Sequence, residues 1–148
     1  KICLLSDDYS SYNFYNMGYG SSIFEEQTSF DRYVEKLNAT TLYDEISPDL
    51  KKSSNNLIKL DVQGAEIKIL KGLKELINLF EVITLEVSLH NYNKNSPLFD
   101  KVMNFMNDNN YKLYDLYDLK RLGKENSFLL QFDCVFVKKD SKLFNVKF

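Results

Sequence analysis

The sequence lacks tryptophan altogether and contains one histidine, two cysteines and two prolines among its 148 residues. It also has little excess charge, since 19 basic and 21 acidic residues give a formal net charge of -2. This balance gives no electrostatic reason to expect binding to nucleic acid or to an anionic membrane. No apolar run approaches the roughly 20 residues that cross a bilayer, and the first residues do not resemble a signal peptide. We therefore expect a globular cytoplasmic domain without nucleic-acid or membrane partners.

The scarce cysteines and glycines exclude two further classes of protein. Cys3 and Cys134 lie far apart in apolar, strand-like runs, which predicts buried thiols rather than a disulfide framework. The five glycines never form a Gly-x-Gly-x-x-Gly motif, which argues against a nucleotide-binding oxidoreductase. Because the chain opens at Lys1 inside an apolar run, we expect it to be part of a longer protein.

The first third of the chain predicts strands connected by polar turns. Residues 2–5 are apolar, and the aromatic stretch 9–24 is typical of a strand or hairpin with a turn at its two glycines. Residues 31–38 fit a strand, although their spacing also allows a helix. Residues 41–46 indicate a short helix that begins behind Thr41. The polar residues 47–56 are typical of a loop.

The remaining residues predict an alternation of strands and helices. Strands are expected at 57–61, 81–87, 111–116 and 128–138, with a helix after Gly64 that breaks at Gly72, a helix that starts with Pro97 in its first position and ends at Asn109, and a loop at 118–126. Alternation predicts a parallel sheet, and two final strands without a helix between them predict an antiparallel pair at its edge. The fold class is therefore α/β with a mixed sheet, and the expected division is one partial domain with an aromatic hairpin region at 1–56, half of a sheet at 57–138 and a tail at 139–148.

Two carboxylates are expected to meet at the carboxyl edge of this sheet. Asp61 and Glu86 end neighbouring strands, and ligands of open α/β sheets bind at that edge. Asp61 could act as a general base, a ligand to a metal or an orienter of the substrate, or it could cap the following helix. Glu86 lies in an apolar strand, where an unpaired charge is costly, so it is expected to be functional or paired, although it could also face solvent at the strand end. His90, the single histidine, suits a base near neutral pH, although a lone loop histidine can also be ordinary surface.

Smaller roles are predicted for the residues around this edge. Gln63 and Gly64 would lie on the rim of the crevice, and Glu66 would face the N-terminal dipole of its helix. Lys59 lies within an apolar strand, so we expect it to pair with Glu66 or with Glu86.

The segment from Leu57 to Gly72, Leu-Ile-Lys-Leu-Asp-Val-Gln-Gly-Ala-Glu-Ile-Lys-Ile-Leu-Lys-Gly, resembles the central signature of the FkbM-type methyltransferases. Three further segments are similar to that family in the same order, namely Leu4-Leu5-Ser6-Asp7, Ile83-Thr-Leu-Glu-Val and Gln131-Phe-Asp-Cys-Val-Phe-Val. The segment Thr41-Leu42-Tyr43-Asp44 is similar to the family's Thr-Leu-Asp, except that Tyr43 is an extra residue. The acidic-Gly-x-Asn-x-Gly loop through which the family binds its cofactor is absent from this sequence.

The resemblance implies a class I methyltransferase (Rossmann-like) fold, present in part, and the cofactor S-adenosylmethionine. It implies O-methylation of a hydroxyl on a sugar or small metabolite, with catalytic Asp61, Glu86 and His90, and cofactor contacts from Ser6, Asp7, Asp61 and Gln63. No metal ligands are assigned. Without the glycine loop we expect this piece alone to bind the cofactor weakly and to be inactive. An unpaired sheet edge predicts a possible homodimer. The alternative is a non-catalytic Rossmann-like interaction module.

Overall fold

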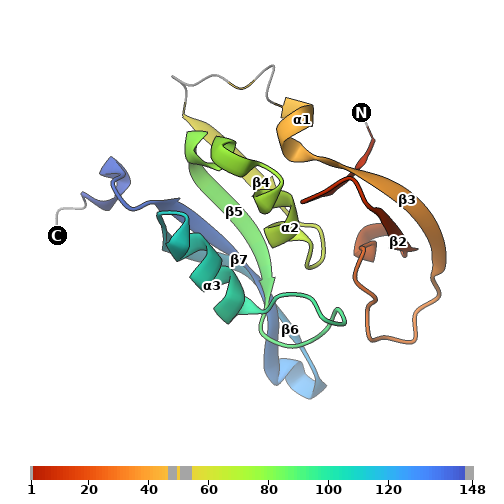
Figure 1. Ribbon diagram of the computed structural model, residues 1–148. Coiled ribbons are helices and arrows are strands. Elements are labelled where there is room, and N and C mark those ends of the chain that lie inside the picture. The colour runs from red at the N-terminus through yellow and green to blue at the C-terminus, as the bar shows by residue number, and fades with distance from the viewer. Residues whose placement is uncertain (1, 47–49, 51–54, 146–148) are drawn as a thin grey trace.

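The computed structural model describes residues 2–46, 50 and 55–145, which form two β-sheets with helices packed against them (Figure 1). Within these residues, a three-stranded sheet has the order β1-β3-β2 and a four-stranded sheet has the order β4-β5-β7-β6. Most of the loop predicted at 47–56 lies outside the described residues, and Asn56 already belongs to a strand. The α/β class is confirmed. The sequence did not indicate that the strands would separate into two sheets.

The four-stranded sheet follows the predicted order of directions. It consists of β4 (Asn56–Leu60), β5 (Phe80–Ser88), β6 (Tyr111–Leu122) and β7 (Phe128–Lys138). The pair β4 and β5 is parallel, whereas β7 is antiparallel to both β5 and β6. The predicted antiparallel pair at the edge is therefore confirmed.

The loop predicted at 118–126 is wrong over its first half, because β6 continues to Leu122. Its charged residues favoured a loop in the sequence. They lie on an edge strand, however, and charged side chains are common there because one side of the strand faces water. A short 3₁₀ turn, Lys124–Asn126, then leads into β7.

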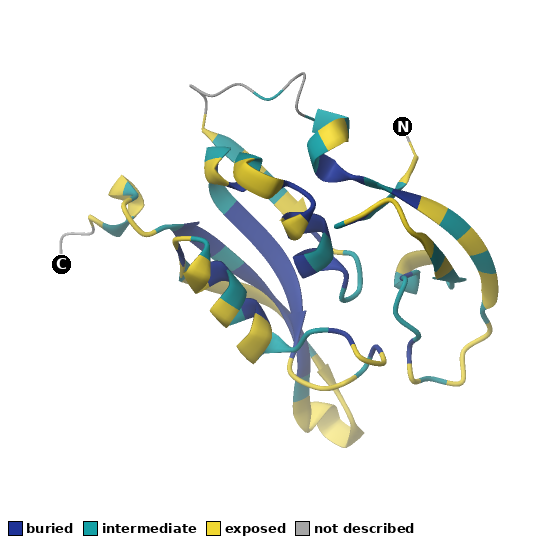
Figure 2. Ribbon diagram, viewed as in Figure 1, coloured by how far each residue is buried: buried dark blue, intermediate teal, exposed yellow. Residues whose placement is uncertain are grey.

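The smaller sheet contains β1 (Leu4–Ser6), β2 (Ser11–Asn16) and β3 (Tyr33–Thr41). The strand alternative for residues 31–38 is thus correct, and the aromatic segment forms the predicted glycine turn, where Gly18–Gly20 is a 3₁₀ helix. Figure 2 shows that these strands are more exposed than β5 and β7. The prediction that both thiols are buried holds only for Cys134, because Cys3 precedes β1 at an exposed position; both cysteines are free.

Three α-helices occur among the described residues, namely α1 (Leu42–Ile46), α2 (Glu66–Lys71) and α3 (Phe99–Asp108). The Thr41 hydroxyl accepts a hydrogen bond from the backbone N–H of Asp44 at 3.3 Å, as its predicted role before α1 requires. Pro97 is not the first helical residue, since Leu98 is still extended and α3 begins one residue later. None of the described helices combines the length and apolar character needed to span a membrane.

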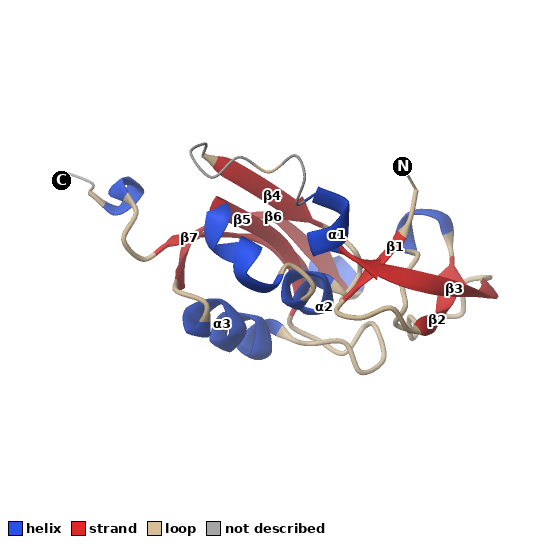
Figure 3. Cartoon of the chain, turned by 45° about the horizontal axis from the view of Figure 1, so that its top comes forward, coloured by secondary structure: helices blue, strands red, loops and turns tan. Residues whose placement is uncertain are grey.

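The predicted break at Gly72 is present. It separates α2 from a 3₁₀ helix, Lys74–Leu79, which ends where β5 begins at Phe80. A Cβ atom at Gly72 would lie 2.3 Å from the Ser6 carbonyl oxygen, so only glycine lets α2 approach β1 this closely. Helices α2 and α3 lie on the same side of the four-stranded sheet (Figure 3). The core between them contains Leu70, Leu73, Ile83, Leu85, Val102, Met106, Tyr111 and Phe136.

Candidate active site

The turn between β4 and α2 positions the central polar residues. Gly64 has a φ of +100°, and a Cβ atom there would lie 2.5 Å from the Ser96 Cβ, so a larger residue does not fit. Gln63 also lies in the left-handed region, with a φ of 52°, which is uncommon for a residue other than glycine. The Ser22 hydroxyl donates a hydrogen bond to the Gln63 carbonyl at 2.9 Å. The surrounding chain therefore holds Gln63 in a conformation that it seldom adopts, whereas Gly64 suits the turn.

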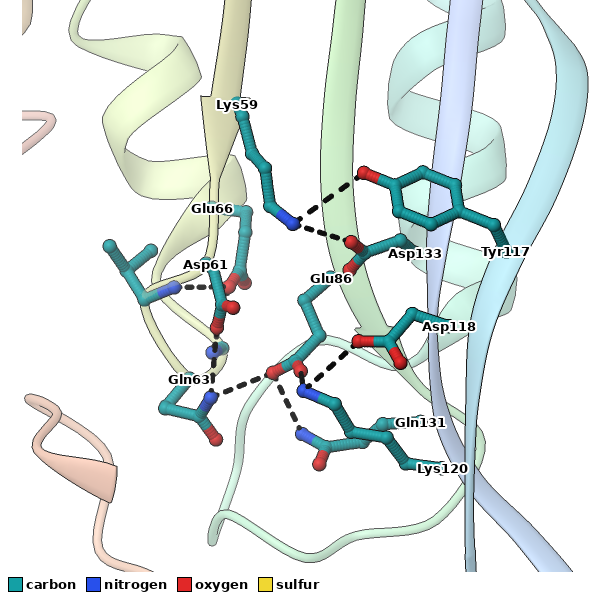
Figure 4. Close-up of polar contacts among 12 residues, drawn as sticks. Lys59, Asp61, Gln63, Glu66, Glu86, Tyr117, Asp118, Lys120, Gln131 and Asp133 are labelled. Carbon is teal, nitrogen blue, oxygen red and sulfur yellow. Dashed lines mark hydrogen bonds and ion pairs between the residues drawn. The ribbon is translucent and has the colours of Figure 1, made fainter. Parts of the chain in front are cut away.

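This turn brings Asp61 and Glu86 together, as the sequence predicted. The Gln63 side-chain amide, through Nε2, donates to Asp61 Oδ1 at 3.0 Å and to Glu86 Oε2 at 2.7 Å (Figure 4). Since both carboxylates bind one nitrogen atom, these oxygens cannot be farther apart than the two bond lengths together. The pair projects from the face of the sheet opposite α3, which lies behind the strands in this view.

Glu86 is buried, and protein donors surround its carboxylate. Lys120 Nζ forms an ion pair with Oε1, and the Gln131 amide donates to Oε2 at 3.2 Å. Burial raises the pKa of Glu86, and repulsion by Asp61 adds to the rise, whereas the bond from Lys120 lowers it. Glu86 in turn raises the pKa of Lys120. The structure thus compensates a buried charge with a lysine from the outer strand of the sheet.

Lys59 does not make either of the ion pairs expected from the sequence. Its Nζ lies 2.6 Å from Asp133 Oδ2 on β7 and 3.5 Å from the Tyr117 hydroxyl on β6. Lys59 lies on β4, and its side chain reaches across β5 to β7 on the same face of the sheet (Figure 4). Asp133 raises the pKa of Lys59. The two ion pairs of this face thus give each buried carboxylate, Glu86 and Asp133, its own lysine partner.

Glu66 begins α2, as expected from its predicted place in the first turn, but it is deeply buried. Its Oε1 accepts hydrogen bonds from the backbone N–H groups of Val62 at 3.0 Å and Gly64 at 3.2 Å. Burial raises the pKa of Glu66 to about 7, although these two donors act in the opposite direction. Glu66 therefore closes the turn that carries Gln63 and is poised to titrate near neutral pH.

This burial predicts that the protein loses stability as the pH rises toward the native pKa of Glu66. Between about pH 4.5 and the native pKa of about 7, the native state keeps a proton that the unfolded chain has released. The free energy of unfolding should therefore fall by about 3 kcal/mol as the pH rises through this window. Glu66→Gln, which cannot ionise, should remove this fall. Urea unfolding at several pH values measures both proteins.

The control is Glu75→Gln, which changes an exposed glutamate in the neighbouring 3₁₀ helix. Its pH dependence should match that of the parent chain, because this replacement on the exposed surface leaves Glu66 buried as before. A Glu66→Gln profile parallel to the parent profile would show that folding does not raise the pKa of Glu66, and would contradict the prediction.

A hollow of about 210 Å³ adjoins the Asp61 side of the pair. Its walls come from the residues before and within β1, the segment after the glycine turn, and the start of α2. It is lined by Cys3, Leu4, Leu5, Phe14, Ser21, Ser22, Ile23, Asp61, Val62, Ala65 and Ile69. Asp61 is thus a carboxylate at the mouth of a largely apolar hollow.

The other predicted site residues lie around this centre without joining the pair. Ser6 Oγ lies 3.0 Å from Asp7 Oδ1, and Asp7 forms an ion pair of 2.9 Å with Lys68 of α2. The His90 ring packs edge-on against Phe128, with ring centroids 5.2 Å apart. It lines a different hollow, of about 450 Å³, with Tyr92 and residues of the β6–β7 hairpin. Among the described residues, His90 forms no hydrogen bond or ion pair with Asp61 or Glu86.

Three residues of this centre were not predicted. Gln131 and Asp133 alternate along β7 and so share the face of Glu86, a period-two signal that the sequence does carry. Lys120 carries no such signal, because its stretch resembles a charged loop. Over the described part of the chain, no group of three or more histidine, cysteine, aspartate or glutamate side chains is arranged to hold a metal ion.

Comparison with known proteins identifies the family. The model of the FkbM methyltransferase domain matches residues 6–113, which include β3, both carboxylates and α3. No curated protein and no solved structure matches the chain. The matched region covers most of the sequence and agrees with the resemblance of the segment 57–72. The chain therefore belongs to the FkbM methyltransferase domain family.

Proposed function

We propose that this protein is an S-adenosylmethionine-dependent O-methyltransferase that acts on a hydroxyl group of a sugar or small metabolite. The family supports methyl transfer in general. The observation that carries the finer proposal is the carboxylate pair Asp61 and Glu86, joined by Gln63 where two parallel strands end. An alcohol is a poor nucleophile until it loses its proton, and a carboxylate in such a crevice can accept that proton.

The hollow beside Asp61 fits part of the proposed methyl donor. Its apolar walls suit an aromatic base, and the exposed carboxylate suits a positively charged sulfur. When bound, S-adenosylmethionine supplies a methyl group activated by that charge. We assign Asp61 and Gln63 to hold the donor. Ser6 and Asp7 directly follow the lining residues of β1 and are assigned to the rim of the hollow.

The residues of the chain provide what the acceptor hydroxyl needs. As the hydroxyl oxygen forms its new bond to the methyl carbon and the carbon–sulfur bond breaks, one of the two carboxylates takes the hydroxyl proton. Gln63 holds both carboxylates in place through its amide. His90 is assigned to contact the acceptor from the second hollow, where it lies beside an aromatic ring.

We further propose that the sheet belongs to a class I, Rossmann-like methyltransferase domain. A parallel pair followed by two strands with β7 reversed agrees with the reversed hairpin that ends such a sheet. The known members of this class bind their ligand at the carboxyl ends of the parallel strands, which is where the carboxylates lie.

Titration of the ¹⁵N-labelled chain with S-adenosylmethionine tests the donor site. We expect saturable chemical-shift changes at Leu4, Ile23 and Val62, which line the hollow, with a Kd on the order of 1 mM. S-adenosylhomocysteine should compete. Changes scattered over the surface, or none up to several times this concentration, would refute donor binding. Transfer of a labelled methyl group to hydroxylated acceptors by the full-length product of the coding sequence tests the reaction itself.

A further inference from the structure

The two carboxylates of the site have very different surroundings. Glu86 accepts from Lys120 at one oxygen and from the Gln63 and Gln131 amides at the other. Its side chain is 1% exposed. An ionised carboxylate has about four lone-pair sites, so these donors occupy most of them. Glu86 could bind an acceptor hydroxyl only by giving up a protein donor.

Asp61 is open where Glu86 is enclosed. It is exposed, and Oδ1 accepts a single hydrogen bond, from Gln63. Within the described residues, no other hydrogen bond or ion pair of its side chain is found, and Asp61 lines the hollow beside β1 whereas Glu86 does not. Of the two carboxylates, Asp61 is therefore the one that an incoming molecule can reach.

The lysine that encloses Glu86 arrives by an irregular route. Lys120 lies on β6, the outermost strand, and its ammonium group passes over β7 to reach Glu86 on β5. The register of β6 against β7 shifts on both sides of Lys120, between Tyr117 and Lys120 and again before Arg121. Such irregularities turn a side chain away from the direction that regular pairing would give it, and they are frequent next to active sites.

The second irregularity of the backbone near Glu86 is at Gln63. Its φ of 52° places its amide between the two carboxylates, a strained conformation that persists only where the surrounding structure holds it. The Ser22 hydroxyl and the close contact of Gly64 with Ser96 supply that hold. The register shift at Lys120 and the backbone of Gln63 thus lie near opposite edges of the sheet, and both side chains contact Glu86.

We propose that Lys120 and Gln63 are positioning residues that hold the Glu86 carboxylate charged and in a fixed place. Asp61 is then the carboxylate that contacts the reacting hydroxyl. This assignment rests on the proposed methyl transfer. It divides the roles of two acids that the sequence cannot tell apart, and it includes a lysine that lies outside the matched family region.

The charges around Glu86 predict how it responds to mutation. Lys120 and Asp118 face it from β6, Asp133 from β7, Asp61 from the end of β4 and Glu66 from α2. Lys120 is the only cation in this group, and the nearby Lys59 is already paired with Asp133. Loss of Lys120 leaves Glu86 buried among acids, which raises its affinity for a proton.

Carbon-13 titration of glutamate-labelled protein measures this affinity without donor or acceptor. In Lys120→Met the proton affinity of Glu86 should rise at least tenfold, and Lys120→Arg, which keeps the charge, should restore most of the parent value. An unchanged Glu86 titration in Lys120→Met overturns the proposal. Should that variant fail to fold, Lys120→Gln, which retains a donor but not the charge, gives the same comparison.

The full-length product of the coding sequence then tests the division of roles. In Glu86→Gln, Lys120 loses its partner and can pair with Asp61, so methyl transfer should fall steeply. Lys120→Met combined with Glu86→Gln removes both charges, and its rate should exceed that of Glu86→Gln at least tenfold. A double variant as inactive as the single one would make Glu86 a reacting group and overturn the proposal. A parent without methyl transfer would instead refute the proposed function, and the titration still decides whether Lys120 controls Glu86.

Discussion

Replacement of Asp61 by asparagine is expected to lower kcat for methyl transfer by about 10²–10⁴-fold, the usual contribution of a positioned general base. The Asp61→Asn side chain would keep the shape of the aspartate, and its amide oxygen could still accept the hydrogen bond from Gln63. What the variant loses is the capacity to take a proton from the acceptor hydroxyl. KM for the acceptor should change less than kcat, because the loss falls on the transition state. Steady-state rates over a range of acceptor concentrations separate the two constants.

Asp108→Asn is the matched control. Asp108 is an exposed aspartate at the end of α3, so its replacement removes the same charge from the molecule at a distance from the site. Its kcat should stay within about twofold of the parent, as expected of a surface substitution without a structural role. Comparable rates for Asp61→Asn and Asp108→Asn would leave Asp61 without a part in proton transfer.

The meeting of Asp61 and Glu86 could be predicted because it follows from topology alone. Two strands separated by one helix pair in parallel, and acids at their ends then share one edge of the sheet. The turn itself was visible in the glycine after Gln63. The break at Gly72 was also visible, because glycine weakens a helix wherever the chain gives it no compensating contact.

The partners of these acids could not be predicted, because they depend on which strands become neighbours. Lys59 was expected to pair with Glu66 or Glu86, but Asp133 on β7 lies within its reach once β7 packs beside β5. Lys120 was hidden by a charged stretch that forms an edge strand. The burial of Cys3 was misjudged for a similar reason, since local apolar character does not reveal where a short strand begins.

The contact between α2 and β1 makes Gly72→Ala the most disruptive single-methyl change expected in this fold. The added Cβ would lie 2.3 Å from the Ser6 carbonyl oxygen, a backbone atom that cannot rotate away. The Gly72 carbonyl also accepts a hydrogen bond from the Tyr43 backbone N–H at 3.2 Å, so a shift of the glycine disturbs α1 as well. We expect a loss of at least about 3 kcal/mol in the free energy of unfolding, the upper range for overpacking. Urea unfolding followed by circular dichroism measures it.

Gly20→Ala separates this clash from the general effect of glycine replacement. A Cβ at Gly20 meets the Glu26 Oε2 atom at 3.2 Å, which is the far end of a flexible side chain, and the Met17 Cβ at 3.9 Å. Its stability should therefore change by less than about 1 kcal/mol. Since Leu4 and Leu5 of β1 line the hollow beside Asp61, Gly72→Ala should also weaken donor binding, whereas Gly20→Ala should not. Equal stability of the two variants would mean that α2 can withdraw from β1 without cost, and the wall of the proposed donor site would then not be fixed by this contact.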